Sequence, residues 1–180
     1  DELVAFIDGL TEDDASKRFG ERNMVDQAKW AAKFYYHPKT NGKYSIKPLL
    51  SAVMSASEYL RDVYSKPIYG SAQLPSSNFS ARVWWEEETD SPGHPKDPYL
   101  LLKDVFSPAL LKSSPDAKYY EKLASIADGS GAMMAYVRSQ SGALTPDVQE
   151  AIAESLLRYC ELDTMAMVMI MQAWLHDPHS

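Results

Sequence analysis

The chain has 180 residues, of which 45% are hydrophobic and 24% charged, so it is long enough to form one globular domain with a buried core. Its net charge is −7 and no basic cluster stands out, which argues against a passive binder of a nucleic-acid backbone. A single cysteine excludes an internal disulfide and a cysteine-based zinc cluster.

Targeting features are also missing from the sequence. It shows no signal peptide and no apolar run of about 18 residues, so we expect a soluble cytoplasmic protein that does not associate with a membrane. Because the first residue is Asp1 rather than Met, we also expect a domain cut from a longer chain.

Residues 1–22 predict short helical turns with an acidic surface. Thr11 has the features of a helix cap, and Asp13 and Asp14 fit solvated first-turn residues better than metal ligands. The next segment, 23–65, is predicted to be helical.

Within this segment, Asn23–Asp26 fits either a short strand or the beginning of a helix. Ser45 is expected to cap a helix that tolerates Pro48 in its first turn. The predicted helices span residues 27–35, 45–53 and 57–64, with a turn at 37–42.

Residues 66–98 are rich in Pro, Gly, Ser and Asn and predict a long irregular loop. Trp84 and Trp85 precede three glutamates within it. They fit a hydrophobic plug beneath the loop better than an aromatic platform for nucleic acid, because the carboxylates would repel a phosphate strand. We expect at most one or two short strands in the whole chain, near residues 24–26 and 66–85.

The last segment, 99–176, is predicted to be helical. Gly129 and Gly131 resemble a phosphate-binding loop only weakly, since no strand precedes them, and a helix beginning there is the better interpretation. Further helices are expected over residues 99–105, 116–127, 132–137 and 145–157.

Thr145-Pro-Asp147 predicts the beginning of a helix that runs to about Leu157 and bends near Arg158. Residues 159–174 are apolar on all sides, which is typical of a buried helix, and Cys160 is expected to be inert packing there. His176 and His179 have a metal-compatible spacing, but at a chain end they are expected to be solvated.

Tyr159 and Asp163 interrupt this apolar helix. Their i,i+4 spacing places them side by side on one face, where a carboxylate and a phenol need partners or water. They form either a satisfied structural pair or part of a site. With eleven Tyr and fourteen Asp, about one such pair is expected by chance, so the spacing needs support from its context.

A wider set of motifs supplies that context. The chain resembles a bacterial family of unknown function that is related to DEDD-type 3′–5′ exonucleases of the RNase H-like superfamily, whose last motif is Tyr-x-x-x-Asp on a C-terminal helix. The resemblance rests on Met24–Asp26, Tyr35–Pro38, Tyr44–Lys47, Tyr64–Gly70, Asp97–Tyr99, Ala132–Tyr136 and Leu156–Thr164.

This resemblance implies a metal-dependent phosphodiesterase that acts on nucleic acid, in which four carboxylates hold two divalent ions. Asp163 would be a ligand for Mg²⁺ or Mn²⁺, and the Tyr159 hydroxyl would orient the attacking water. Asp26 would be structural, or would reach the metal site only indirectly.

The family's first motif, Asp-x-Glu, does not occur anywhere in the sequence. The resemblance therefore implies that the chain is the C-terminal half of an α/β RNase H-like fold, inactive by itself, whose missing N-terminal part is a partner. Such a half would expose apolar surface that favours a homodimer.

The alternative is a helical interaction or scaffold domain without catalytic activity. The two hypotheses differ in what surrounds Asp163 and Tyr159. A half-nuclease should leave them facing a cleft or an exposed apolar seam, whereas a scaffold should bury them beside a partner such as Arg158 or a backbone amide. Either way, the sequence predicts a mainly helical structure.

Overall fold

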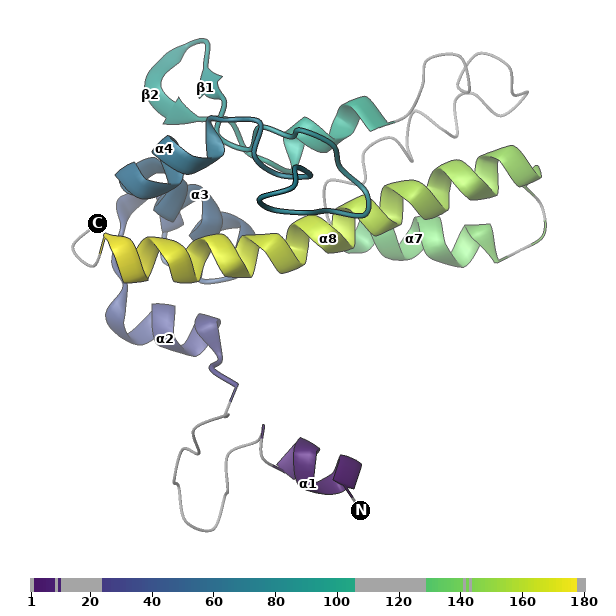
Figure 1. Ribbon diagram of the computed structural model, residues 1–180, viewed down its shortest axis with the longest axis horizontal. Coiled ribbons are helices and arrows are strands. Elements are labelled where there is room, and N and C mark those ends of the chain that lie inside the picture. The colour runs from purple at the N-terminus through teal and green to yellow at the C-terminus, as the bar shows by residue number, and fades with distance from the viewer. Residues whose placement is uncertain are drawn as a thin grey trace.

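The computed structural model describes residues 2–8, 10, 24–105, 129–140, 142 and 144–177, and it is mainly helical as predicted (Figure 1). Within these residues the only sheet is one pair of short antiparallel strands. The predictions for Thr11, Asp13 and Asp14, for the helix over 116–127 and for His179 lie outside the described residues.

Helix α8, Pro146–His176, is the element on which three other α-helices pack. It begins at Thr145 with proline in its first turn, as predicted. The expected end near Leu157 is wrong, because one uninterrupted helix runs through Arg158 and crosses the molecule in Figure 1. No glycine or proline breaks the stretch. Its length is supported by the helices that pack on it, which are α3, Ile46–Ala56, α4, Glu58–Tyr64, and α7, Gly129–Ser139.

Two helices joined at Ser57 cover one side of α8. They are α3, Ile46–Ala56, and α4, Glu58–Tyr64, as predicted. The Ser57 hydroxyl accepts a hydrogen bond from the Leu60 amide and donates one to Asp177 at the end of α8. This contact anchors the α3–α4 corner to the last turn of α8. The fully buried side chains at this packing include Leu49, Leu50, Val53, Leu162, Met169 and Ile170.

Helix α2, Gln27–Phe34, begins at Asp26, whose carboxylate accepts a hydrogen bond from the Lys29 amide at 3.1 Å. This bond holds the pKa of Asp26 below its ordinary value. Residues 24–26 therefore lead into a helix rather than forming a strand, and the Asp26 carboxylate caps that helix. The following turn contains a short 3₁₀ helix η1, Pro38–Thr40.

The loop after α4 closes over the core through its aromatic residues. Trp84 and Trp85 are 0% and 8% exposed, and the Trp85 indole donates to the Met54 carbonyl at 3.0 Å. The rings of Tyr69 and Phe79 pack edge-on against Trp84. The plug interpretation of the tryptophans is confirmed, because buried rings cannot stack on a nucleic-acid strand.

A hairpin follows the plug. Strands β1, Glu87–Glu88, and β2, Ser91–Pro95, pair antiparallel inside the segment for which an irregular loop was predicted. The expected strand region at 66–85 contains only isolated bridges from Tyr69 to Leu74 and Arg82. A short hairpin of exposed Glu, Pro and Gly residues carries no apolar alternation by which a strand could be recognised.

The remaining elements are η2, Leu100–Val105, α7, Gly129–Ser139, and α1, Glu2–Asp8. Helix α7 begins at Gly129, so the glycine pair opens a helix as expected. Helix α1 lies away from the other helices in Figure 1 and exposes Leu3 and Ile7. No helix among the described residues is long and apolar enough to cross a membrane.

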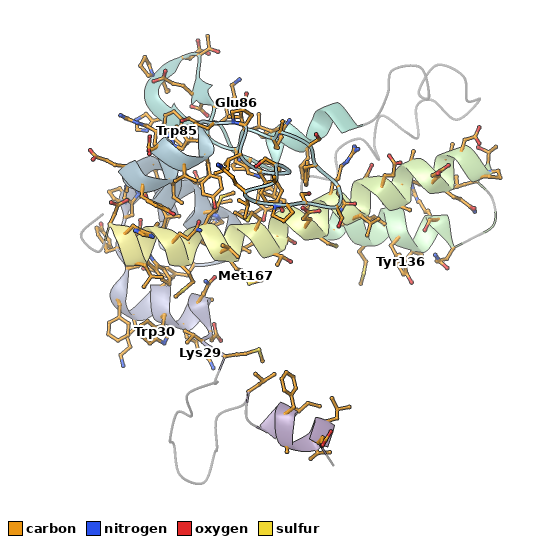
Figure 2. The ribbon with its side chains drawn as sticks, viewed as in Figure 1. Lys29, Trp30, Trp85, Glu86, Tyr136 and Met167 are labelled. Carbon is orange, nitrogen blue, oxygen red and sulfur yellow. The ribbon has the colours of Figure 1, made fainter. Side chains whose placement is uncertain are left out.

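Helix α8 is not buried on all sides as its composition predicted. Its outer face exposes a row of apolar side chains, among them Met167 (labelled in Figure 2), Leu157, Val168 and Leu175. Cys160 lies on this face and is exposed, so the expectation of inert packing is wrong. We call these side chains the outer face of α8.

Candidate functional site

Tyr159 and Asp163 lie on α8 where η2 begins. The Tyr99 hydroxyl donates a hydrogen bond to Asp163 Oδ1 at 2.5 Å, and the rings of Tyr99 and Tyr159 are 5.8 Å apart between centroids. Tyr159 is 6% exposed and Asp163 is half-buried. The structure therefore joins the two predicted residues to Tyr99 in a single cluster, although Tyr99 had been assigned no role.

A positive charge completes this cluster. The Lys47 ammonium lies 4.3 Å from the centroid of the Tyr99 ring and 5.3 Å from that of Tyr159, both within cation–π range. Burial and the hydrogen bond to Asp163 raise the pKa of Tyr99 far above its ordinary value. Tyr99 is therefore a neutral hydrogen-bond donor to Asp163 at any physiological pH.

The hydrogen-bond partner of Asp163 is not the one that was predicted. Arg158, the expected partner, instead donates from Nε to the Asn78 carbonyl at 3.2 Å. Among the described residues, Oδ2 of Asp163 accepts no hydrogen bond, so one of its two oxygens has a donor and the other is open. A carboxylate held in this way can still accept a donor or a cation at its second oxygen.

The described residues do not form a metal centre by themselves. Among them there is no group of three or more His, Cys, Asp or Glu side chains that could hold an ion. Asp163 offers one ligand oxygen, while hard cations such as Mg²⁺ need about six. Any divalent ion at Asp163 would therefore need further ligands, from water or from outside the described part of the chain.

Glu161, two residues away on α8, is a polar residue that sequence reasoning missed. Its carboxylate accepts hydrogen bonds from the Tyr69 hydroxyl at 2.5 Å, from the Ser76 hydroxyl, and from the Asn78 side-chain amide at 2.5 Å. Burial acts to raise its pKa, but these donors together hold the pKa of Glu161 below its ordinary value. Glu161 thus fastens the 69–79 loop to α8, a role that no local sequence pattern indicates.

A second missed feature is a hollow of about 600 Å³ beside the first turn of α3. Lys39, Lys43 and Lys47 line it together with small polar side chains, and we call it the lysine hollow. Lys47 also covers the Tyr99 and Tyr159 rings, so the hollow adjoins the Asp163 cluster. The sequence did hold a signal for it, because residues 27–57 contain five lysines and no acidic residue.

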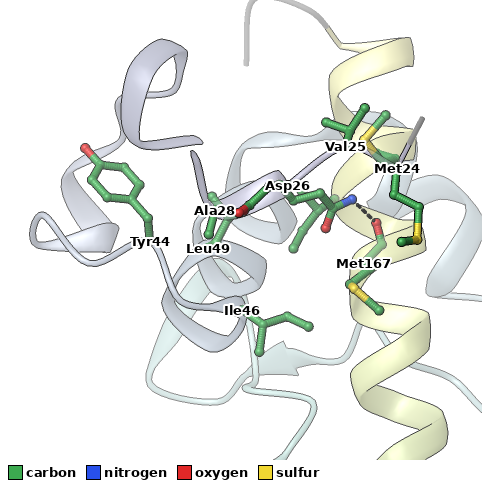
Figure 3. Close-up of a pocket in the computed structure, with 11 residues that line it drawn as sticks. Met24, Val25, Asp26, Ala28, Tyr44, Ile46, Leu49 and Met167 are labelled. Atoms are coloured by element: carbon green, nitrogen blue, oxygen red, sulfur yellow. Dashed lines mark hydrogen bonds between the residues drawn. The ribbon is translucent and has the colours of Figure 1, made fainter. Parts of the chain in front are cut away.

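A third feature is an apolar groove of about 560 Å³ between α8 and the beginning of α2 (Figure 3). Its lining residues include Met24, Val25, Ile46 and Met167. The Gln27 side chain also lines it and donates to the Met167 carbonyl at 2.8 Å. Met167 follows Asp163 by one helical turn, so the groove and the outer face of α8 lie next to the Asp163 cluster.

Comparisons with other proteins assign no family to this arrangement. No protein-family model matches the chain, and neither the curated proteins nor the solved structures contain a significant match.

Proposed function

We propose that the chain is the C-terminal part of a metal-dependent 3′–5′ exonuclease-like phosphodiesterase, with an α/β RNase H-like fold that is completed by elements outside it. The observation that carries this proposal is Asp163, whose Oδ1 is held by Tyr99 while Oδ2 is open among the described residues. In the exonucleases that the sequence resembles, an aspartate at this motif position binds metal. Asp163 would supply one ligand for Mg²⁺ or Mn²⁺.

The apolar surface around Asp163 supports the missing half of the fold. The outer face of α8 and the apolar groove expose large side chains beside the cluster, among them Met167 and Val168. An apolar face of this length is normally covered, and a sheet packed on α8 would cover it. The upstream strands would then bring the first acidic motifs towards Asp163.

A second function, a helical scaffold, is favoured by a different observation. Tyr159 is buried, and Tyr99 satisfies one oxygen of Asp163, which is the kind of internal pairing expected of a structural role. In that case the outer face of α8 would bind another protein, and Asp163 would only fix the position of η2 against α8.

Calorimetric titration of Mn²⁺ separates the two functions. The titration is made with the 180-residue chain and with a chain extended upstream, each beside its Asp163→Asn variant. Asp147→Asn is the matched control, because Asp147 is an exposed aspartate in the first turn of the same helix. We expect binding that depends on Asp163 only in the extended chain, with Asp147→Asn unchanged.

Two results would contradict the proposal in different ways. Absence of binding that depends on Asp163 in the extended chain would favour the scaffold. Metal-dependent cleavage by the purified 180-residue chain, lost in Asp163→Asn, would instead show that the chain is not half of a site.

A further inference from the structure

The apolar groove between α8 and the beginning of α2 is suited to an apolar occupant. Most of its lining residues are apolar, and three of them are methionines, Met24, Met167 and Met171, whose flexible side chains adapt to an inserted group. Among its polar lining residues, Asp26 caps α2, and the Gln27 side chain donates to the Met167 carbonyl at 2.8 Å (Figure 3). The groove therefore fits apolar side chains from another segment better than a charged ligand.

Helix α1 carries side chains of the matching kind. Leu3 and Ile7 are one turn apart on the same face of this helix and are 69% and 48% exposed. Val4, beside them, is 58% exposed. An isolated helix of seven residues is too short to be stable in water, so its stability depends on packing against another surface. Because α1 lies apart from α2 and α8 in Figure 1, we expect its apolar face to pack on a surface that it does not contact there.

Two backbone hydrogen bonds fix the direction of α1 relative to the groove. The Leu10 amide donates to the Ile7 carbonyl at 3.0 Å, and the Met24 amide donates to the Leu10 carbonyl at 2.9 Å. Since Met24 lines the groove, Leu10 is held at its rim, while α1 extends away from α2 and α8 (Figure 1). As long as both bonds are kept, α1 points away from the groove of its own chain. The groove that it can fill is then that of a second copy.

The charges of the two segments also favour this pairing. Residues 1–8 carry three acidic side chains and no Lys or Arg, whereas α2, whose first turn borders the groove, carries Lys29 and Lys33 and no acidic residue. Lys29 pairs with Asp26 at 3.6 Å, but Lys33 is exposed and forms no ion pair with any described residue. An acidic α1 is therefore attracted to the basic side of the groove, although the net charge of −7 opposes unspecific association of two copies.

We infer that α1 of a second copy occupies the apolar groove, with Leu3 and Ile7 as the inserted side chains. The exchange is reciprocal, because each copy supplies one α1 and one groove, and it closes as a two-fold symmetric dimer. It is a case of helix-in-groove recognition, in which anchor side chains are spaced by one helical turn. The inference does not rest on the proposed function, and it leaves the outer face of α8 uncovered at Leu157 and Leu175.

The test is sedimentation velocity of the 180-residue chain at concentrations up to about 100 μM. The variant is Leu3→Asp/Ile7→Asp. Its control is Met133→Asp/Val137→Asp, which has the same spacing on α7 at residues that are 68% and 56% exposed. Both variants change the net charge from −7 to −9, from −7 − 2. We expect dimers of the wild type and the control, and a dissociation constant at least about 100-fold higher in the α1 variant, because each groove loses two apolar side chains.

Two further variants examine the groove and the origin of the helix that fills it. Met24→Asp/Met167→Asp changes two exposed lining residues and should weaken the dimer as much as the α1 variant does. Ile7→Cys/Met171→Cys, with the exposed Cys160 changed to Ala, should form disulfide-linked dimers on oxidation, seen on a non-reducing gel. A link between two chains shows that α1 comes from the second copy.

Four outcomes would overturn the inference. The first is a wild-type chain that stays monomeric over the whole concentration range. The second is an equal loss in the α7 control, which would assign association to exposed apolar surface in general. The third is an unchanged dissociation constant in the α1 variant or in the groove variant, which would place the dimer contact elsewhere. The fourth is a disulfide within one chain, which would make α1 a cover for its own groove. None of these measurements involves metal, so the exchange and the proposed function fail separately.

Discussion

Glu161 and Asp163 are two carboxylates on the same helix, two residues apart, and their surroundings differ completely. Glu161 accepts hydrogen bonds from three side chains of one loop, Tyr69, Ser76 and Asn78. Asp163 accepts one, from Tyr99, and its second oxygen has no donor among the described residues. A carboxylate surrounded by donors holds the fold together, whereas one with an open oxygen retains capacity to bind something else.

The regions around the two carboxylates differ in the same way. The Glu161 side holds the plug, in which Trp84 is fully buried beneath the rings of Tyr69 and Phe79. The Asp163 side adjoins the lysine hollow, the apolar groove and the outer face of α8, all of which are open. Substitutions on the Glu161 side should therefore reduce stability, and those on the Asp163 side should mainly reduce binding.

The largest effect is expected for Trp84→Ala, which empties the centre of the plug. Loss of a fully buried tryptophan should lower the free energy of unfolding by about 3–5 kcal/mol, measured by urea denaturation. Trp30→Ala is the control, because Trp30 is 52% exposed and should change stability by less than about 0.5 kcal/mol. Equal losses of stability in Trp84→Ala and Trp30→Ala would show that the buried plug contributes no more to stability than an exposed tryptophan does.

Gly70→Ala should be next, at about 2–4 kcal/mol. Gly70 has a φ of +80°, and an added Cβ would lie 2.2 Å from the Phe79 carbonyl oxygen. Gly93 has a φ of +82° with open space around it, so Gly93→Ala measures the backbone strain alone, about 1–2 kcal/mol. The difference between the stability losses of the two variants measures the cost of the contact between the added Cβ at residue 70 and the Phe79 carbonyl. Equal losses would show that this contact has no cost.

Glu161→Gln should lower stability by about 1–3 kcal/mol, since the Asn78 amide would face another donor. The pKa of Glu161 is lowered in the folded state, so its contribution is present above the ordinary value of 4.5 and is lost as pH falls below it. Stability measured against pH should therefore fall less in the variant than in the wild type below that value. Glu154→Gln, exposed on the same helix, should follow the wild type.

The smallest effect concerns the Tyr99–Asp163 hydrogen bond. A double-mutant cycle of Tyr99→Phe and Asp163→Ala should give a coupling energy of about 1–2 kcal/mol, because the bond joins a buried phenol to a half-buried carboxylate. A coupling energy near zero would mean that Tyr99 does not orient Asp163, so the hydrogen bond to Tyr99 would not hold this carboxylate in place.

The sequence by itself determined most of the helices. Ser45, Ser57 and Thr145 precede helices where the sequence predicted helix beginnings, because local apolar spacing acts within a few residues. Of these three, only Ser57 makes a capping bond with its side chain, and at Asp26, which also caps a helix, the sequence had left a strand open. The same local reasoning placed Trp84 and Trp85 in the core. It could not find the hairpin, whose strands are short and lack alternation.

Only the tertiary structure decided what surrounds each polar residue. Tyr99 reaches Asp163 across 64 residues of chain, and Tyr69 reaches Glu161 across 92, so neither pair has a local signature. The apolar composition of α8 predicted burial on all sides, but packing covers only one face within the described chain and leaves Met167 and Val168 exposed. The apolar composition of a helix indicates how much of its surface is favourable to bury. Which face is actually buried depends on the elements that pack against the helix in the tertiary structure.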